Sequence, residues 1–316
     1  MHFGCDDATI RKAMGETMAT DSNLRKLQLT ELALMQDFDR MCKKHGLRYY
    51  LLGGTLLGAV RHGGFIPWDD DVDLCMPRED YMRFLEIAPA ELAGKPGISL
   101  VSVHSDETYR QGMAKITDSS VQVINRSANE DRYEEAWIDI IPMDGFPTGF
   151  AAVAHKIRLM FWRVMDCTAE FDYVIDTKRD RGFVGNLMVK VVGLFSKVVR
   201  PYGDDFHRVL MNTENCLRRY AYDESPRAIN LHAARGFREI FDREWLGEGR
   251  PVMFEGVEFV APANIEAVLT AIYGPDYMTP PPEGERNWHN SEIIVSENVQ
   301  GDLSAALASP AASEKL

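Results

Sequence analysis

The sequence predicts an α+β protein, with a mixed β-sheet flanked by helices and a helical insertion near its middle. Apolar residues recur at helical spacing early in the chain, and short apolar or aromatic runs bounded by Gly, Pro and Asp follow, as is typical of strands. The composition, 45% hydrophobic and 26% charged over 316 residues, is that of a globular protein able to bury a large core.

Glycines mark the ends of the first predicted elements. Residues Leu24–His45 place apolar side chains on one helical face, and Gly46 follows as a helix end requires. The run 48–52 is aromatic and apolar, which predicts a strand that ends at Gly53-Gly54. The next segment, 55–61, predicts a short helix.

A loop at 65–68 precedes a predicted strand at 71–76, and Pro77 then opens a further helix, since Pro suits the first helical turn. The turn-rich segment 142–149 is predicted to leave the sheet. Four more runs are predicted strands: 98–103, 113–116, 121–124 and 137–141.

The segment 151–201 differs in charge from the rest of the chain. It holds nine Lys and Arg against five Asp and Glu, a net charge of +4, which leaves −17 for the remainder. Two amphipathic helices are predicted in it, at 151–166 and 184–200. Such basic helices can lie on an anionic membrane surface, and the alternative is an ordinary packed helical insertion.

One domain is predicted over residues 24–302, between a poorly ordered extension (1–23) and a flexible Ala- and Ser-rich tail (303–316). The start lacks a signal peptide pattern, no long uncharged apolar run occurs, and the five cysteines are scattered. We therefore expect a cytoplasmic protein, with contact at the inner face of the membrane if the basic helices bind there. The net charge of −13 argues against nucleic acid as a partner.

The clearest chemical signal is a Gly-Gly turn followed by an acidic run. Gly53-Gly54 stands between a strand and a helix, where bare backbone amides can approach an anion. Alternation along a strand would put Asp71 and Asp73 on one face, and Asp139, framed by isoleucines, supplies a third carboxylate. Such oxygen ligands suit a hard divalent cation.

The alternative is a solvated acidic loop at 69–73, with Asp139 a hydrogen-bonded strand residue. The acidic run passes directly into an apolar strand and lies beside the Gly-Gly turn. These neighbours favour the interpretation as a site.

The segment from Gly53 to Asp73, GGTLLGAVRHGGFIPWDDDVD, resembles the signature of the LicD family, which includes bacterial phosphocholine transferases and fukutin-type proteins. The resemblance covers roughly residues 24–294. It continues in several shorter matches: 115–118, 137–145, 254–256, 273–274, 281–282, Arg286 and His289.

The resemblance implies a nucleotidyltransferase-like fold, whose pattern is a Gly-Gly turn, an Asp-x-Asp strand and a third Asp. The step of 17 residues from Gly54 to Asp71 is longer than in many members of that superfamily but matches LicD proteins. The implied reaction is transfer of a phospho-alcohol, most often phosphocholine, from a CDP-alcohol to a sugar hydroxyl of a cell-surface glycan precursor, with release of CMP. Such acceptors are often lipid-linked.

By this resemblance Asp71, Asp73 and Asp139 would be catalytic and would hold Mg²⁺, or Mn²⁺ in its place, with Asp139 alternatively a general base. Arg61 and Lys115 would counter phosphate charge, or are surface cations. The candidate substrate-binding residues are Gly53, Gly54, Thr55, Arg61, His62, Trp68, Asp69, Asp70, Lys115, Trp137 and His289.

Among these, His62 and His289 would bind phosphate or relay protons, and the alternative for each is a structural role. The indoles of Trp68 and Trp137 would cage the quaternary ammonium of choline, unless they are core aromatics.

Two other functions remain open at this point. A nucleotidyltransferase that moves NMP from an NTP to a small molecule would use the same carboxylates and release pyrophosphate. A non-catalytic protein that binds glycans or membrane surfaces would need none of them.

Overall fold

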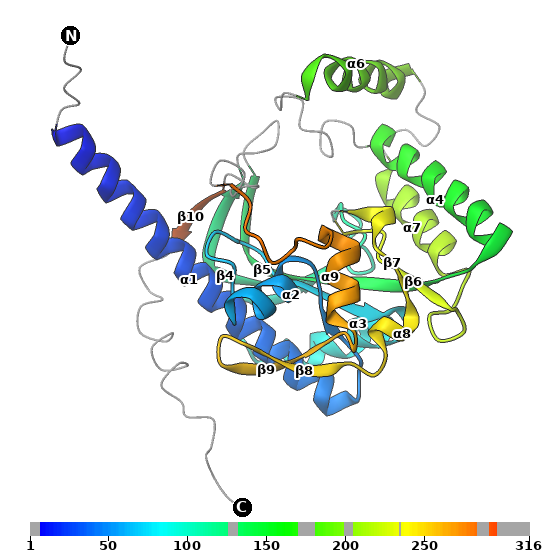
Figure 1. The fold of residues 1–316 in the computed structure, drawn as a ribbon, viewed down its shortest axis with the longest axis horizontal. Helices are drawn as coiled ribbons and strands as arrows, with labels where there is room; N and C mark the ends of the chain where they lie inside the picture. The colour runs from blue at the N-terminus through cyan, green and yellow to red at the C-terminus, as the bar shows by residue number, and fades with distance from the viewer. Residues whose placement is uncertain are drawn as a thin grey trace, which may run out of the picture.

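In the computed structural model, a mixed sheet of eight strands organises the described part of the chain, residues 7–125, 132–169, 181–198, 205–233, 235–282 and 291–295 (Figure 1). Its main path runs β1 (Tyr50–Leu51), β2 (Asp73–Pro77), β5 (Arg132–Phe146), β4 (Ala114–Asn125) and β10 (Ser291–Val295). The β2–β5 pair is parallel and the other pairs are antiparallel, so the α+β class with a mixed sheet is confirmed.

Three strands extend this path: β3 (Ile98–Val101) pairs with β4, β6 (Arg227–Ile229) pairs with the end of β5, and β7 (Ile240–Asp242) pairs with β6. A separate hairpin consists of β8 (Arg250–Phe254) and β9 (Val257–Ala261).

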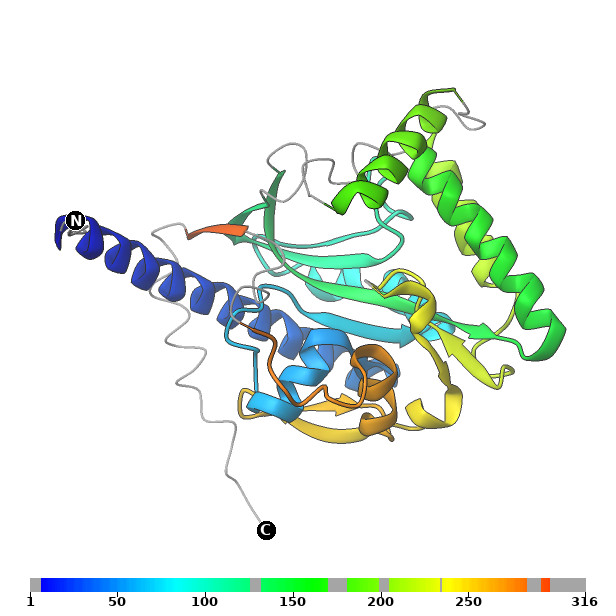
Figure 2. The same cartoon turned by 45° about the horizontal axis from the view of Figure 1, so that its top comes forward.

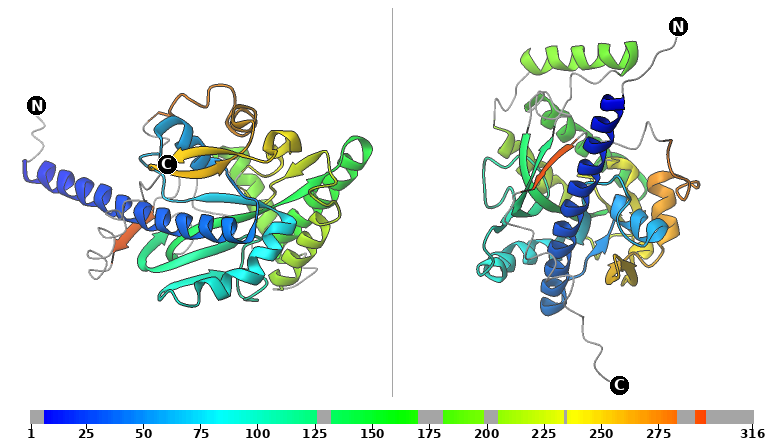
Figure 3. Two further views of the ribbon diagram at one scale, coloured as in Figure 1. Left: turned by 90° about the horizontal axis from the view of Figure 1, so that it is seen from below. Right: turned by 90° about the vertical axis from the view of Figure 1, so that its left-hand side faces the viewer.

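The long helix α1 (Asp7–His45) crosses β10, β4 and β5, and its N-terminal part projects beyond the sheet (Figures 2 and 3). The helix α2 (Gly53–His62) packs on β2, and α9 (Ile265–Tyr273) and the β8–β9 hairpin pack on α2. The helix α3 (Arg78–Leu92) packs on β2, β3 and β5.

On the opposite side of the molecule, α4 (Gly149–Ala169) packs on α7 (Phe206–Leu217) and on α6 (Gly182–Val198). The short helices η1 (Gly236–Arg238) and α8 (Arg243–Leu246) flank β7.

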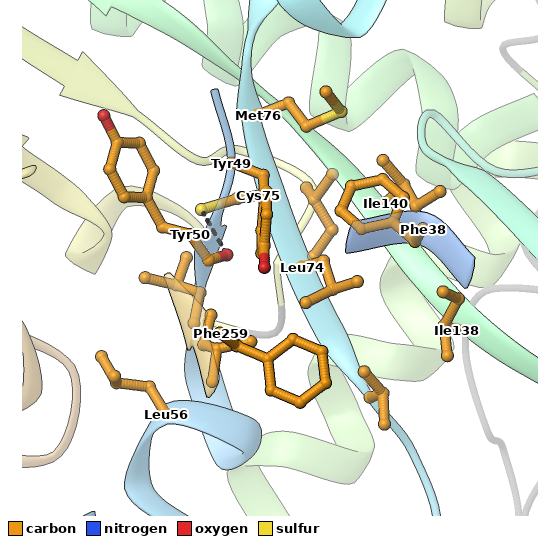
Figure 4. Close-up of a cluster of buried hydrophobic side chains, with 14 of the residues drawn as sticks. Phe38, Tyr49, Tyr50, Leu56, Leu74, Cys75, Met76, Ile138, Ile140 and Phe259 are labelled. Carbon is orange, nitrogen blue, oxygen red and sulfur yellow. Dashed lines mark hydrogen bonds between the residues drawn. The ribbon is translucent and has the colours of Figure 1, made fainter. Parts of the chain in front are cut away.

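The main core lies where α1 meets the sheet and the hairpin. Phe38 from α1 packs among buried side chains that include Leu74, Ile138, Ile140 and Phe259 (Figure 4). A second core joins α4, α7 and the end of β5 through Phe146, Leu159 and Leu217. A third joins Leu27 of α1 to Trp137, so α1 covers the face of β5 that carries Trp137.

Most predicted elements are present, with shifted boundaries. The first helix begins at Asp7 rather than Leu24, so its backbone runs through much of the segment predicted to be a poorly ordered extension. Both helices predicted in 151–201 form, as α4 and α6. The predicted tail, 303–316, lies outside the described residues.

Three strand predictions were wrong in detail. The runs 113–116 and 121–124 belong to one strand, β4, because a shift in pairing between Asp118 and Gln122 accommodates the polar residues between them. The strand predicted from residue 71 begins at Asp73, although Val72 O still accepts a hydrogen bond from Asp139 N at 2.8 Å.

The third correction concerns residues 142–146, which continue β5 rather than form a turn. Asp is a residue type typical of turns, yet Asp144 is buried within the strand. Its burial is tolerated because Arg78 forms two hydrogen bonds with its carboxylate, at 2.8 and 2.7 Å. No helix in the described part of the chain combines the length and the apolar character needed to cross a bilayer.

Candidate active site

The Gly-Gly turn follows β1 in the chain and begins α2, and hydrogen bonds connect it to the start of β2. Leu52 N donates to Asp73 O at 3.2 Å, and Asp73 N donates to the buried hydroxyl Oγ1 of Thr55 at 2.8 Å. Gly53 has a φ of +54°, in the left-handed region that favours glycine. These contacts place the N-terminus of α2 beside the first residue of β2.

The lack of a side chain at both glycines lets the carboxylates of Asp73 and Asp69 come close to the backbone of the turn. A Cβ at Gly53 would overlap the carboxylate of Asp73, and a Cβ at Gly54 would lie 2.6 Å from Asp69 Oδ2. The sequence predicted that this turn exposes bare backbone to an anion, and the anionic groups found there are side chains of the acidic run.

Asp73 and Asp139 occupy paired positions on the adjacent parallel strands β2 and β5. Lys115 faces Asp139 from β4, with Nζ 3.8 Å from Asp139 Oδ1. Trp137 Nε1 donates to Asp139 Oδ2 at 3.2 Å, and Lys115 Nζ lies 4.2 Å from the centre of a Trp137 ring. The sheet thus brings together two of the three predicted carboxylates and one predicted cation.

The site concentrates negative charge. Burial raises the pKa of Asp73 well above its ordinary value, and the charges of Asp71 and Asp139 raise it further. Asp71 lies just before β2 and is close enough to act on Asp73. All three predicted catalytic carboxylates therefore belong to one electrostatic cluster.

Sequence reasoning missed a carboxylate that α1 adds to this cluster. Glu31 is fully buried, and neither of its carboxylate oxygens has a hydrogen-bond partner within the described residues. Burial raises its pKa, followed by the charges of Asp71, Asp70 and Asp69. An acid on the helix face that carries Leu27, Leu34 and Met35 was the signal available in the sequence.

A second missed acid, Glu239, lies between η1 and β7. Its carboxylate accepts hydrogen bonds from Arg235 N at 3.3 Å and from Asn230 Nδ2 at 3.0 Å. Burial raises the pKa of Glu239 to about 7, and its charge raises the pKa of Asp73. Tyr273 of α9 borders the same cluster, since burial and then the Asp73 charge raise its pKa.

The helix α1 also holds the loop that carries the acidic run. Gln28 Nε2 donates to Asp69 O at 3.0 Å and to Ile66 O at 3.4 Å. Arg25 forms an ion pair with Glu255 at 2.6 Å, and Glu255 Oε1 accepts from Phe65 N at 3.1 Å. The loop is thereby fixed between α1 and the β8–β9 hairpin.

The donor atoms fit a hard divalent cation, because they are carboxylate oxygens whose mutual repulsion a cation would relieve. However, no three His, Cys, Asp or Glu side chains in the described ranges already surround one point as metal ligands.

The other predicted residues divide into two places. Arg61 donates to Tyr277 O at 3.1 Å and to His62 Nε2 at 3.0 Å, and the His62 ring stands edge-on to Trp68, with centroids 6.3 Å apart. Burial lowers the pKa of Arg61, and the charges of Tyr273 and Asp69 offset part of this by raising it.

Asp70 is buried and Asp69 is half-buried in the same loop. Trp137 lies in the core under Lys115, so it and Trp68 have different aromatic or cationic partners. The choline cage stays a prediction, and His289 lies outside the described residues.

Comparison with known proteins agrees with the resemblance noted in the sequence. A model of the LicD/FKTN/FKRP nucleotidyltransferase domain matches residues 46–144, which include the Gly-Gly turn, Lys115 and all three predicted catalytic carboxylates. The chain is 27% identical over 270 residues to the lipopolysaccharide cholinephosphotransferase LicD of Haemophilus influenzae, covering 84% of this chain and 96% of that protein.

A shorter match is to the ribitol 5-phosphate transferase FKRP of Homo sapiens, 38% identical over 96 residues, which cover 28% of this chain and 19% of FKRP. An uncharacterized protein of Rickettsia typhi is 37% identical over 76 residues, 22% of this chain and 25% of that protein.

Proposed function

Because this chain belongs to the LicD/FKTN/FKRP nucleotidyltransferase domain family, we propose that it transfers a phospho-alcohol from a CDP-alcohol to a hydroxyl group of a glycan precursor and releases CMP. The chain is a transferase of this family. The proposed alcohol is choline, since the relative that aligns over nearly its whole length is a cholinephosphotransferase. A ribitol phosphate is the second candidate, from the shorter match to FKRP.

The observation that carries the proposal is the pairing of Asp73 with Asp139 beside the Gly53–Gly54 turn. Phosphoryl transfer requires positioning and charge neutralisation more than covalent chemistry by the protein. Rigid strands hold these carboxylates, and the turn removes the side chains that would obstruct them.

In the proposed reaction, the acceptor oxygen forms a bond to the phosphorus that carries the alcohol, and the bond from that phosphorus to the oxygen of CMP breaks. Mg²⁺, or Mn²⁺, held by Asp71, Asp73 and Asp139 would neutralise charge on the diphosphate. Lys115, whose Nζ lies 3.8 Å from Asp139 Oδ1, and Arg61, on which the charge of Asp69 acts, would counter the phosphate charge. Asp139 is the candidate to accept the proton of the acceptor hydroxyl, with Trp137 orienting its carboxylate.

A product assay tests this proposal. Purified protein is incubated with a mixed glycan acceptor and, separately, CDP-choline, CDP-ribitol, CDP-glycerol or NTPs, with Mg²⁺ or with EDTA, and products are identified by mass spectrometry. We expect metal-dependent CMP release from one CDP-alcohol. Asp73→Asn should reduce it by about a hundredfold or more, because an amide is a poor ligand and carries no charge.

The matched control is Asp242→Asn, which changes an exposed strand carboxylate and should leave turnover intact. Pyrophosphate from an NTP would contradict the proposal and identify the nucleotidyltransferase alternative. Equal turnover by Asp73→Asn would refute the assigned site.

A further inference from the structure

The helices α4 and α6, which lie next to each other in Figures 1 and 2, carry apolar side chains that are exposed to solvent. On α4 the exposed set is Phe150, Val153, Ile157, Met160, Phe161 and Val164. On α6 it is Phe183, Leu187, Met188, Val191 and Leu194. Exposed apolar side chains gathered on two neighbouring helices are typical of an interaction site.

The spacing shows that these are organised stripes. On α4 the exposed residues recur every three or four positions, while His155 and Leu159 lie on a different, buried face toward α7. The core of the domain therefore uses one face of α4 and leaves the other available.

The charges on α4 and α6 indicate an anionic partner. The helix α4 has three basic residues and one acidic residue, and α6 has two lysines and no acid, although the whole chain carries a net charge of −13. By helical geometry, Arg158 and Arg163 flank the α4 stripe on opposite sides, and Lys190 flanks the α6 stripe. An apolar stripe bordered by cations matches the interface of an anionic bilayer, where apolar groups insert and cations meet headgroups.

Between the two helices lies an apolar groove of about 460 Å³. Met160, Val164 and Cys167 of α4 line it from one side, and Val191 and Val192 of α6 from the other. Its walls continue the exposed stripes, because Met160, Val164 and Val191 belong to both.

We propose that the α4–α6 face docks on the surface of an anionic lipid bilayer, with both helices lying in the interface.

A short segment connects this face to the candidate active site. Phe237 lines the groove, and Gly236 has a φ of +51° and lies against the guanidinium of Arg163. Glu239, two residues after Phe237, raises the pKa of Asp73 through its charge. Arg235 lies over the ring of Tyr273, with Cζ 5.3 Å from the ring centroid. Docking would therefore set the catalytic cluster close to the membrane, where a lipid-linked acceptor could reach it. This last consequence rests on the proposed function, and the docking itself does not.

Vesicle sedimentation tests the docking without any substrate. Full-length protein is mixed with vesicles of phosphatidylcholine alone or with 30 mol% phosphatidylglycerol, at low and high salt. We expect binding to the anionic vesicles that weakens at high salt. The double variant Met160→Glu/Met188→Glu, at positions 50% and 63% exposed, should reduce binding about tenfold or more.

The matched control is Met253→Glu/Met278→Glu, the same substitutions at positions 52% and 50% exposed outside α4 and α6, which should bind as the wild type does. Circular dichroism checks that both variants fold. Absence of wild-type binding to anionic vesicles would overturn the proposal. So would a wild-type dimer in analytical ultracentrifugation that the α4–α6 variant dissociates, since a second copy would then cover the face. Because the assay contains no CDP-alcohol, its failure is distinguishable from failure of the proposed reaction.

Discussion

Gly53 and Asp73 are in a contact that only glycine permits, because a Cβ at position 53 would occupy the space of the Asp73 carboxylate. The left-handed φ of Gly53 and the hydrogen bond from Leu52 N to Asp73 O fix the two residues in this relation. The Gly-Gly turn thus positions an acidic side chain as well as a helix N-terminus.

Gly53→Ala should abolish activity and destabilise the protein by more than Gly63→Ala does. Gly63 also has a positive φ, +72°, but among the described residues no atom beyond its two chain neighbours lies within 4 Å of the position its Cβ would take. Gly63→Ala therefore measures backbone strain alone, on the order of 1–2 kcal/mol. Equal losses of stability in chemical denaturation, with activity retained in Gly53→Ala, would contradict the contact.

Asp73→Asn should stabilise the metal-free protein at neutral pH. The folded state raises the pKa of Asp73 above its ordinary value of 3.8, so ionised Asp73 disfavours folding once the pH exceeds that value. Below pH 3.8 the Asp73 carboxyl is protonated in both the folded and the unfolded state, so the stability gained by the variant disappears. Thermal melts in EDTA measure this difference. Adding Mg²⁺ should raise the melting temperature of the wild type more than that of the variant, and an equal rise would argue against Asp73 as a ligand.

Glu31→Gln should also be stabilising above the ordinary pKa of glutamate and neutral well below it. The amide keeps the shape of the buried side chain and removes a charge that Asp71, Asp70 and Asp69 repel. The expected gain at pH 8 is on the order of 1–3 kcal/mol, read from urea unfolding. Glu86→Gln, an exposed site on α3, is the control and should change little. A loss of stability at pH 8 would mean that Glu31 is stabilised by a partner.

Glu239 should give the stability of the protein a pH dependence between about 4.5 and 7. Its folded pKa is about 7 against an ordinary 4.5, so stability is retained below 4.5 and falls as the pH rises toward 7. The total change is at most about 3 kcal/mol. Glu239→Gln should remove this part of the profile in melts taken at half-unit steps of pH. An unchanged profile would refute the assignment.

Arg78→Met should destabilise the protein by about 3–5 kcal/mol, because it leaves buried carboxylates unpaired. Arg78 binds Asp144 through two hydrogen bonds and lies 3.3 Å from Glu214, which His104 also contacts at 2.9 Å. Arg83→Met, on the exposed face of the same helix, should cost far less. Adding Asp144→Asn to Arg78→Met should recover part of the loss, and a further additive loss would argue against the pair.

Much of the fold follows from patterns a few residues long. The helical period of 24–45, the aromatic run that forms β1 and the amphipathic pattern of α4 and α6 are local, so the sequence predicts them directly. The same holds for the acidic run and for Asp139 within its apolar strand, which predict a candidate site inside the segment that the family model matches.

Only tertiary structure decided which distant residues join that site. Lys115 faces Asp139 because of the register of β4 on β5, and no local pattern encodes that register. Packing of α1 and the η1–β7 segment adds Glu31 and Glu239, and Arg78 keeps Asp144 in a strand where its type predicts a turn. Periodicity records which face of an element is buried, whereas the partner buried against that face is set by how the elements pack.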